Sequence, residues 1–123
     1  LALFTSPFGA RILGARDLRR EFKFSVLVPA QAYFPVAADA PEENVLLQGV
    51  IDCLIETRDG FVILDFKTDR IKKGGAVERA EQYRPQLAAY ARAVHEIYGR
   101  SVRACVLYFF HTGDTEWVSL GED

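Results

Sequence analysis

The sequence is poor in the residues from which many metal sites are built. It has no methionine, two cysteines and two histidines among 123 residues. Two thiols are too few for a zinc knuckle or for an iron–sulfur cluster held by four cysteines. Cys53 and Cys105 stand in apolar runs, which predict buried free thiols. Because methionine is absent, we expect the chain to be a piece of a longer protein.

Long hydrophobic runs and an excess of positive charge are missing as well. No apolar run approaches the roughly 20 residues that span a bilayer, and the start lacks the pattern of a secretory signal peptide. The formal net charge is −2, so any attraction for phosphate has to be local. These absences predict a single domain over residues 1–123, without a membrane partner and in the cytoplasm.

Hydrophobic patterning predicts a mixed α/β (α+β) fold. We expect a main helix that starts near Arg84, carries Pro85 in its first turn and ends at Gly99. The apolar, branched segments predict strands over residues 21–29, 45–56, 61–68, 102–110 and 115–120. Residues 1–18 predict the end of a helix, and residues 30–44 and 69–75 predict loops. The strand–helix–strand step predicts a crossover that places 102–110 parallel to 61–68.

Three charged residues interrupt the most apolar strands. Asp52 lies within 45–56, and Asp65 and Lys67 lie within 61–68. Such charges are rare on buried strand faces unless they are paired or bind a metal. Since side chains alternate along a strand, Asp65 and Lys67 share one face.

The register of this hairpin decides which residue Asp52 meets. If Glu56 faces Phe61, Asp52 lies opposite Asp65; if Arg58 faces Phe61, it lies opposite Lys67. Both registers place the three charged groups on one face. Two carboxylates this close repel unless a cation lies between them, and oxygen ligands suit Mg²⁺ or Mn²⁺. The alternative is a solvent-facing hairpin with an ordinary cross-strand Asp–Lys pair.

Three linked motifs resemble the RecB-like branch of the PD-(D/E)xK nuclease superfamily. They are Gln48-Gly49-Val50-Ile51-Asp52, then Val62-Ile63-Leu64-Asp65-Phe66-Lys67-Thr68, then Gln82-Tyr83-Arg84-Pro85-Gln86-Leu87-Ala88-Ala89-Tyr90. Within that branch the chain is most similar to the C-terminal nuclease domain of AddA-type subunits of bacterial helicase–nucleases. Two earlier runs add to this likeness, Ser6-Pro7-Phe8-Gly9 and Arg20-Glu21-Phe22-Lys23-Phe24. The resemblance implies a restriction-endonuclease-like core: a mixed β-sheet with a hairpin, a crossover helix and following strands.

The resemblance also implies roles for individual residues. Asp52, Asp65 and the backbone carbonyl of Phe66 would ligate Mg²⁺, with Mn²⁺ as a substitute, and Lys67 would activate the attacking water. Gln86 and Tyr90 match a Q-x-x-x-Y motif that supports such a site or touches DNA. The alternatives are an ordinary residue near a helix N-terminus for Gln86 and an aromatic at the edge of the core for Tyr90.

Other polar residues are less clearly placed by the sequence. Arg70, Lys72 and Lys73 follow the catalytic strand and could grip DNA phosphates, or they could form a solvated loop. Glu21 could approach the metal or form a structural ion pair. The family usually has a further metal-site residue, commonly histidine, on an upstream helix. His95 and His111 come too late in the chain to match it, so the site could be incomplete.

The activity implied by the resemblance is a Mg²⁺-dependent DNA exonuclease that processes double-strand breaks for recombinational repair. Its partners would be DNA, a helicase motor in the same parent chain and a second helicase–nuclease subunit. No iron–sulfur cluster is expected, because RecB-like nucleases that hold one usually carry four cysteines. The alternatives are another RecB-like nuclease and a non-catalytic DNA- or partner-binding module on the same fold.

Overall fold

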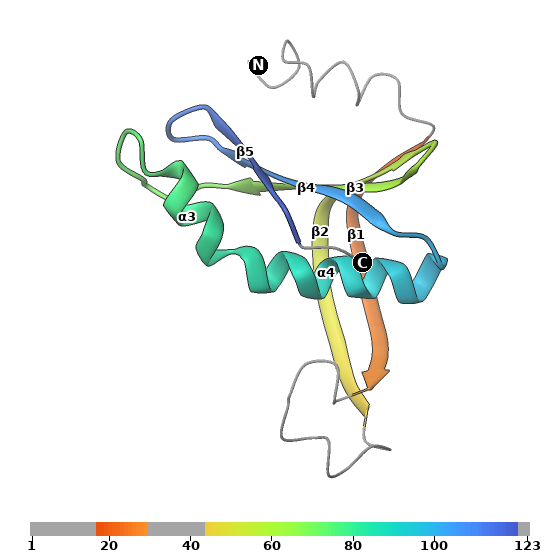
Figure 1. Ribbon diagram of the computed structural model, residues 1–123. Coiled ribbons are helices and arrows are strands. Elements are labelled where there is room, and N and C mark those ends of the chain that lie inside the picture. Colours follow the sequence, from red (N-terminus) through yellow and green to blue (C-terminus); the bar gives the residue numbers. More distant parts are fainter. Residues whose placement is uncertain (1–16, 30–43, 121–123) are drawn as a thin grey trace.

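The strands form one five-stranded mixed sheet in the order β1-β2-β3-β4-β5, and the helices cross one of its faces (Figure 1). The computed structural model describes residues 17–29 and 44–120. In chain order the elements are β1 (Asp17–Pro29), β2 (Asn44–Thr57), β3 (Gly60–Lys67), α3 (Ala76–Gln82), α4 (Arg84–Tyr98), β4 (Val102–Phe109) and β5 (Asp114–Val118). Among these residues, no helix is long and apolar enough to cross a membrane.

Strands β1 and β2 form a long antiparallel ribbon that extends beyond the rest of the sheet (Figure 1). Along β1, the side chains of Phe22, Phe24, Val26 and Val28 share a partly or fully buried face, as their alternation predicts. The strand starts earlier than residue 21, so Asp17 and Leu18 are extended and not helical. The rest of the helix expected over 1–18, and all but the last residue of the loop expected over 30–44, lie outside the described residues.

At Glu21 and Asp52 the regular alternation of side chains between the two faces of the ribbon is interrupted. These two positions interrupt the β1–β2 ladder, and Glu21 has a left-handed φ of 51°. Ile51 packs in the core beneath α4, whereas Cys53 packs in the core on the opposite face. Residues two apart on a regular strand would share a face, so β2 twists over between them. Asp52 therefore lies at the point where the strand turns.

The β2–β3 hairpin adopts the first of the two registers considered above. Glu56 faces Phe61, Thr57 pairs with Gly60, and Arg58 and Asp59 form the turn. The ladder ends at Cys53 and Leu64, one pair short of the position where Asp52 would meet Asp65. The two aspartates thus stand where the strands begin to separate.

The crossover between β3 and β4 contains two helices that meet at Tyr83. The short helix α3 is a separate element that the sequence pattern did not distinguish. Helix α4 runs from Arg84 to Tyr98, has Pro85 in its first turn, and ends at Gly99 with a left-handed φ of 70°, as predicted. Strand β4 pairs parallel to β3, which confirms the predicted crossover connection.

Both faces of β3 are buried, which explains its nearly continuous hydrophobicity. Beneath α4 the main core holds Phe24, Ile51, Leu54, Ile63, Leu87, Val94, Leu107 and Phe109, among others. The opposite face holds Cys53, Ile55, Val62, Leu64, Val106 and Tyr108. Cys53 and Cys105 are buried free thiols, as the sequence predicts. A charged side chain on the α4 side of β3 is therefore removed from bulk water.

Candidate functional site

Asp52 is tied to the backbone of the neighbouring strand. Its Oδ2 accepts a hydrogen bond of 2.7 Å from the backbone N–H of Phe66. This bond replaces a rung of the β2–β3 ladder, which has ended two residues earlier on β3. An extended residue directs its N–H and its C=O to the same side of the strand, so the Phe66 carbonyl also points toward β2. Asp52 and the Phe66 carbonyl thus face the same gap.

Asp65 is the one buried charged residue among those the structure describes, with 5 % of its surface exposed. Burial raises the pKa of this carboxyl from 3.8 to about 7, and a hydrogen bond with Asp52 adds to the rise. Lys67 acts in the opposite direction. The ionisation of Asp65 therefore depends on both Asp52 and Lys67.

Lys67 has a polar or aromatic partner on three sides. Its Nζ lies 2.8 Å from Asp65 Oδ2 and donates a hydrogen bond of 3.1 Å to Gln86 Oε1. The same ammonium lies 4.0 Å from the centre of the Tyr83 ring. The Lys67 side chain is 14 % exposed, so most of it is enclosed by these partners. Gln86, in the Q-x-x-x-Y motif, thus contacts the lysine of the D-x-K strand directly.

Tyr90 stands beside the two carboxylates. Burial raises the pKa of its hydroxyl, and the charges of Asp65 and Asp52 raise it further. Its ring makes an edge-on contact with Phe24, with 5.5 Å between the centroids. A Cβ on Gly49 would lie 2.9 Å from Phe24 Cζ and 3.0 Å from Tyr90 Cε1. Gly49 therefore lets α4 approach β2 closely enough to bring Tyr90 to the site.

Asp69, Arg79 and Tyr83, whose roles the sequence did not predict, form a hydrogen-bonded group, and Tyr83 links this group to Lys67. Asp69 Oδ2 accepts hydrogen bonds of 2.6 Å from the Tyr83 hydroxyl and from Arg79 Nη1. The Tyr83 hydroxyl is the main cause of a lowered pKa at Asp69, with Arg79 contributing. One signal was available in the sequence: Tyr83 precedes Gln86 by three residues, which places both near one helix face.

The donor set of this gap fits a divalent metal ion that prefers oxygen. Asp65 Oδ2 is buried, and the Lys67 ammonium lies 2.8 Å from it. A buried carboxylate needs a compensating positive charge; Lys67 supplies one, while two carboxylates, Asp52 and Asp65, interact here. Asp52 and the Phe66 carbonyl add two oxygens of the kind that Mg²⁺ and Mn²⁺ bind. Within the described ranges no three His, Cys, Asp or Glu side chains gather, so the described residues offer two carboxylates and one carbonyl oxygen.

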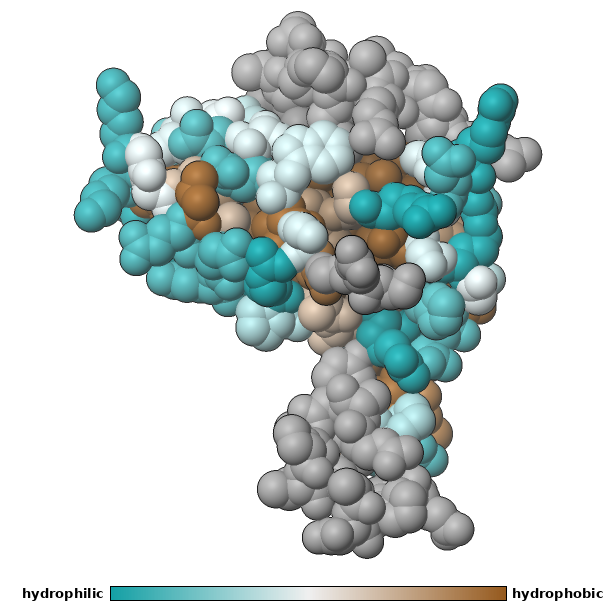
Figure 2. All heavy atoms as spheres, in the orientation of Figure 1, coloured by the Kyte–Doolittle hydropathy of each residue, from teal (hydrophilic) through white to brown (hydrophobic). Residues whose placement is uncertain are grey.

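The basic loop after β3 lies beside the group formed by Asp69, Arg79 and Tyr83. Arg70 and Lys72 line a hollow of about 380 Å³ together with Arg79 and Gln82, whereas Lys73 is exposed and does not line it. Figure 2 shows hydrophilic side chains gathered at the end of the molecule where α3 lies. The loop is therefore both solvated and positioned beside the residues that hold Lys67.

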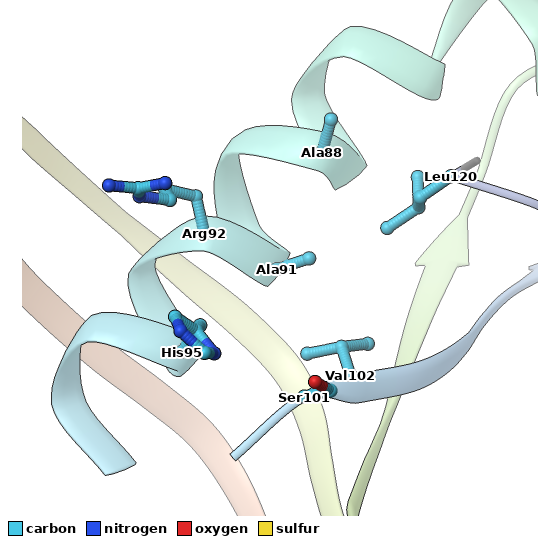
Figure 3. A pocket seen from close by; sticks show the side chains of 7 residues that line it. All are labelled: Ala88, Ala91, Arg92, His95, Ser101, Val102 and Leu120. Carbon is cyan, nitrogen blue, oxygen red and sulfur yellow. The ribbon is translucent and has the colours of Figure 1, made fainter. Parts of the chain in front are cut away.

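The other polar residues that the sequence raised do not join the site. Glu21 is exposed, makes no ion pair with a described residue, and belongs to no group that could hold a metal. His95 and His111 are exposed. His95 borders a hollow of about 310 Å³ between α4 and Leu120 (Figure 3), and none of the residues lining it belongs to the carboxylate cluster.

Comparisons with known proteins identify the family of the chain. Residues 6–118 match the PD-(D/E)XK nuclease superfamily. The chain is 43 % identical to the A-type subunit of an ATP-dependent helicase/nuclease from Desulforudis audaxviator, over 93 % of this chain and 9 % of that protein. Subunits of the same name from Pelotomaculum thermopropionicum and Bacillus licheniformis are 43 % and 42 % identical, over 91 % and 92 % of this chain and 9 % and 10 % of theirs. The chain thus spans about a tenth of the length of these relatives. Its five-stranded mixed sheet with two helices is consistent with the restriction-endonuclease-like fold, and the chain belongs to the PD-(D/E)XK nuclease superfamily.

Proposed function

We propose that this chain is a metal-dependent nuclease domain that hydrolyses the phosphodiester backbone of DNA. The observation that carries the proposal is the buried Asp65 carboxylate, which interacts electrostatically with Asp52 and lies 2.8 Å from the Lys67 ammonium. A structural ion pair on a hairpin surface would be exposed, and this one is enclosed. Perturbed carboxyl groups of this kind are typical of catalytic sites.

The residues divide the chemistry between binding and proton transfer. Asp52, Asp65 and the Phe66 carbonyl would hold Mg²⁺, or Mn²⁺ in its place. A bound divalent ion supplies Lewis acidity and lowers the pKa of a coordinated water. Lys67 supplies a positive charge beside the reacting phosphate and holds the attacking water by hydrogen bonding. Gln86 keeps that ammonium in place, and Tyr90 closes the site on the α4 side.

The basic loop is the proposed contact for the DNA backbone. Arg70 and Lys72 line one hollow beside Asp69 and Arg79, and Lys73 is exposed next to them. Phosphate contacts of this kind position a strand without reading its sequence. The acidic net charge makes such a local patch necessary.

The relatives suggest the setting in which the domain works. They are ATP-dependent helicase/nuclease subunits, so the parent protein would couple this exonuclease to a helicase motor, and its partner would be a second helicase–nuclease subunit. Bacterial cytoplasm and the processing of double-strand breaks for recombination fit that setting. The second candidate is a non-catalytic DNA- or partner-binding module, which the absence of a third acidic or histidine ligand within the described ranges favours.

The decisive experiment compares wild-type protein with Lys67→Met and Asp65→Ala. Mn²⁺ and Mg²⁺ binding is measured by calorimetry, and cleavage is measured on end-labelled single-stranded DNA. We expect wild type to bind and cleave, Lys67→Met to bind the metal without cleaving, and Asp65→Ala to do neither. Asp59→Asn, an exposed change in the β2–β3 turn, is the matched control and should behave as wild type. Metal binding without cleavage by wild type would favour the non-catalytic module, and absence of binding would refute the metal site.

A further inference from the structure

We infer that Tyr83, anchored by Asp69 and Arg79, is a positioning residue that keeps Lys67 in its reactive place. This inference rests on the proposed nuclease function. Lys67 Nζ lies 4.0 Å from the centre of the Tyr83 ring, and the ring belongs to the junction between α3 and α4. The crossover helices thus contribute an aromatic contact to the D-x-K strand in addition to the Gln86 hydrogen bond.

The orientation of the Tyr83 ring is fixed by its hydroxyl group. That hydroxyl donates a hydrogen bond of 2.6 Å to Asp69 Oδ2, and the same oxygen accepts a second bond of 2.6 Å from Arg79 Nη1. The Asp69 side chain is 16 % exposed, so water competes little for this carboxylate. Asp69 follows Lys67 by two residues, and Arg79 belongs to α3. The end of β3 and the helix junction are therefore joined by one carboxylate.

An aromatic face offers Lys67 a contact that a metal ion does not disturb. The attraction between Lys67 and Asp65 weakens when the Asp65 charge is shared with a divalent cation. The face of an aromatic ring attracts an ammonium group through its quadrupole and carries no net charge that the cation could neutralise. Four rotatable bonds would otherwise let the ammonium swing away from the site. Tyr83 and Gln86 together retain Lys67 in the metal-bound enzyme.

The test compares Tyr83→Leu, which removes the ring, with Tyr83→Phe, which removes only the hydroxyl. The first measurement is the NMR signal of the Lys67 ε-methylene protons, recorded without metal or DNA and assigned by its loss in Lys67→Met. A ring beneath the ammonium shifts these protons upfield. We expect this shift in wild type, its loss in Tyr83→Leu, and its partial retention in Tyr83→Phe and in Asp69→Asn.

The second measurement is the kinetics of DNA cleavage. A cation–π contact contributes about 0.5–2 kcal/mol, so kcat should fall roughly 2- to 30-fold in Tyr83→Leu, with KM nearly unchanged and substantial rescue in Tyr83→Phe. Tyr98→Leu is the matched control, because Tyr98 is a partly buried aromatic at the far end of α4 that packs on Phe61. It should reduce stability without moving the Lys67 signal or kcat.

Two results would overturn the inference. One is an unchanged Lys67 signal in Tyr83→Leu. The other is a loss of kcat in Tyr83→Leu that Tyr98→Leu reproduces, since that would show a general loss of stability. If wild type fails to cleave DNA, the proposed function fails instead, and the Lys67 signal alone decides whether Tyr83 holds the lysine.

Discussion

The buried carboxyl of Asp65 should make the metal-free protein less stable as the pH rises. Its pKa is raised from 3.8 to about 7, chiefly by burial. Above pH 4 the unfolded chain releases this proton while the folded chain retains it, so the folded state loses relative stability until about pH 7 and then levels off. At about 1.4 kcal/mol per pH unit, the total loss is at most about 4 kcal/mol. Asp65→Asn removes this dependence.

Urea unfolding in EDTA at a series of pH values from 4 to 8 measures the effect. Subtracting the curve of Asp65→Asn cancels the titration of all other groups, and the difference should fall steadily as the pH rises to about 7. At pH 8 Asp65→Asn should then be more stable than wild type, because residues kept for function often reduce the stability of the fold. Asp59→Asn, at an exposed turn position, should give a curve parallel to that of wild type.

Adding the metal should return much of the stability that wild type loses at high pH. A cation at 100 times its Kd stabilises the folded state by about 2.7 kcal/mol, and this gain should be seen in wild type and be absent in Asp65→Asn. Parallel pH curves for wild type and Asp65→Asn in EDTA would refute the reasoning, because they would mean that folding does not raise the pKa of Asp65. A gain from Mn²⁺ that persists in Asp65→Asn would place the metal elsewhere.

Two further substitutions test the backbone geometry around the site. Gly49→Ala should lower the free energy of unfolding by about 1–3 kcal/mol through overpacking, because its Cβ would lie 2.9 Å from Phe24 and 3.0 Å from Tyr90. Urea unfolding measures this change. An unchanged free energy of unfolding would show that α4 can move away freely. Glu21→Val should lower the free energy of unfolding by about 1–2 kcal/mol more than Lys23→Val on the same strand. The reason is that φ is 51° at Glu21, a region that β-branched residues avoid. Equal costs at both positions would mean that the backbone at Glu21 is ordinary.

The elements of the fold could largely be predicted because each has a local signal. The alternation of Phe22, Phe24 and Val26 predicted a strand, and Gly99 marked the end of α4. The hairpin register stayed open between two solutions, because turns of either length fit the residues 57–60. The tertiary pairing of Glu56 with Phe61 settled it.

The site was predictable in its residue types and not in its contacts. A charge inside an apolar strand marked Asp65 and Lys67, but the face change at Glu21 and Asp52 breaks the alternation on which register arguments rest. No local pattern shows that the side chain of Asp52 replaces a backbone rung. The support that Lys67 receives from Tyr83 depends on how the crossover helices dock, which is decided by packing over the whole sheet.

The spacing of the site along the chain has a consequence for the order of assembly during folding. Asp52 and Phe66 are 14 residues apart and meet when a local hairpin closes. Lys67 and Gln86 are 19 residues apart and meet only after the helix that carries Gln86 docks on the sheet, which is a slower step than the closing of a hairpin. A refolding chain would therefore acquire its pair of carboxylates before its lysine is fixed. We expect Mn²⁺ that is present from the start to accelerate refolding, and Mn²⁺ that is added after refolding to change only the rate of unfolding. Equal refolding rates with and without the ion would mean that the carboxylate pair forms after the rate-limiting step.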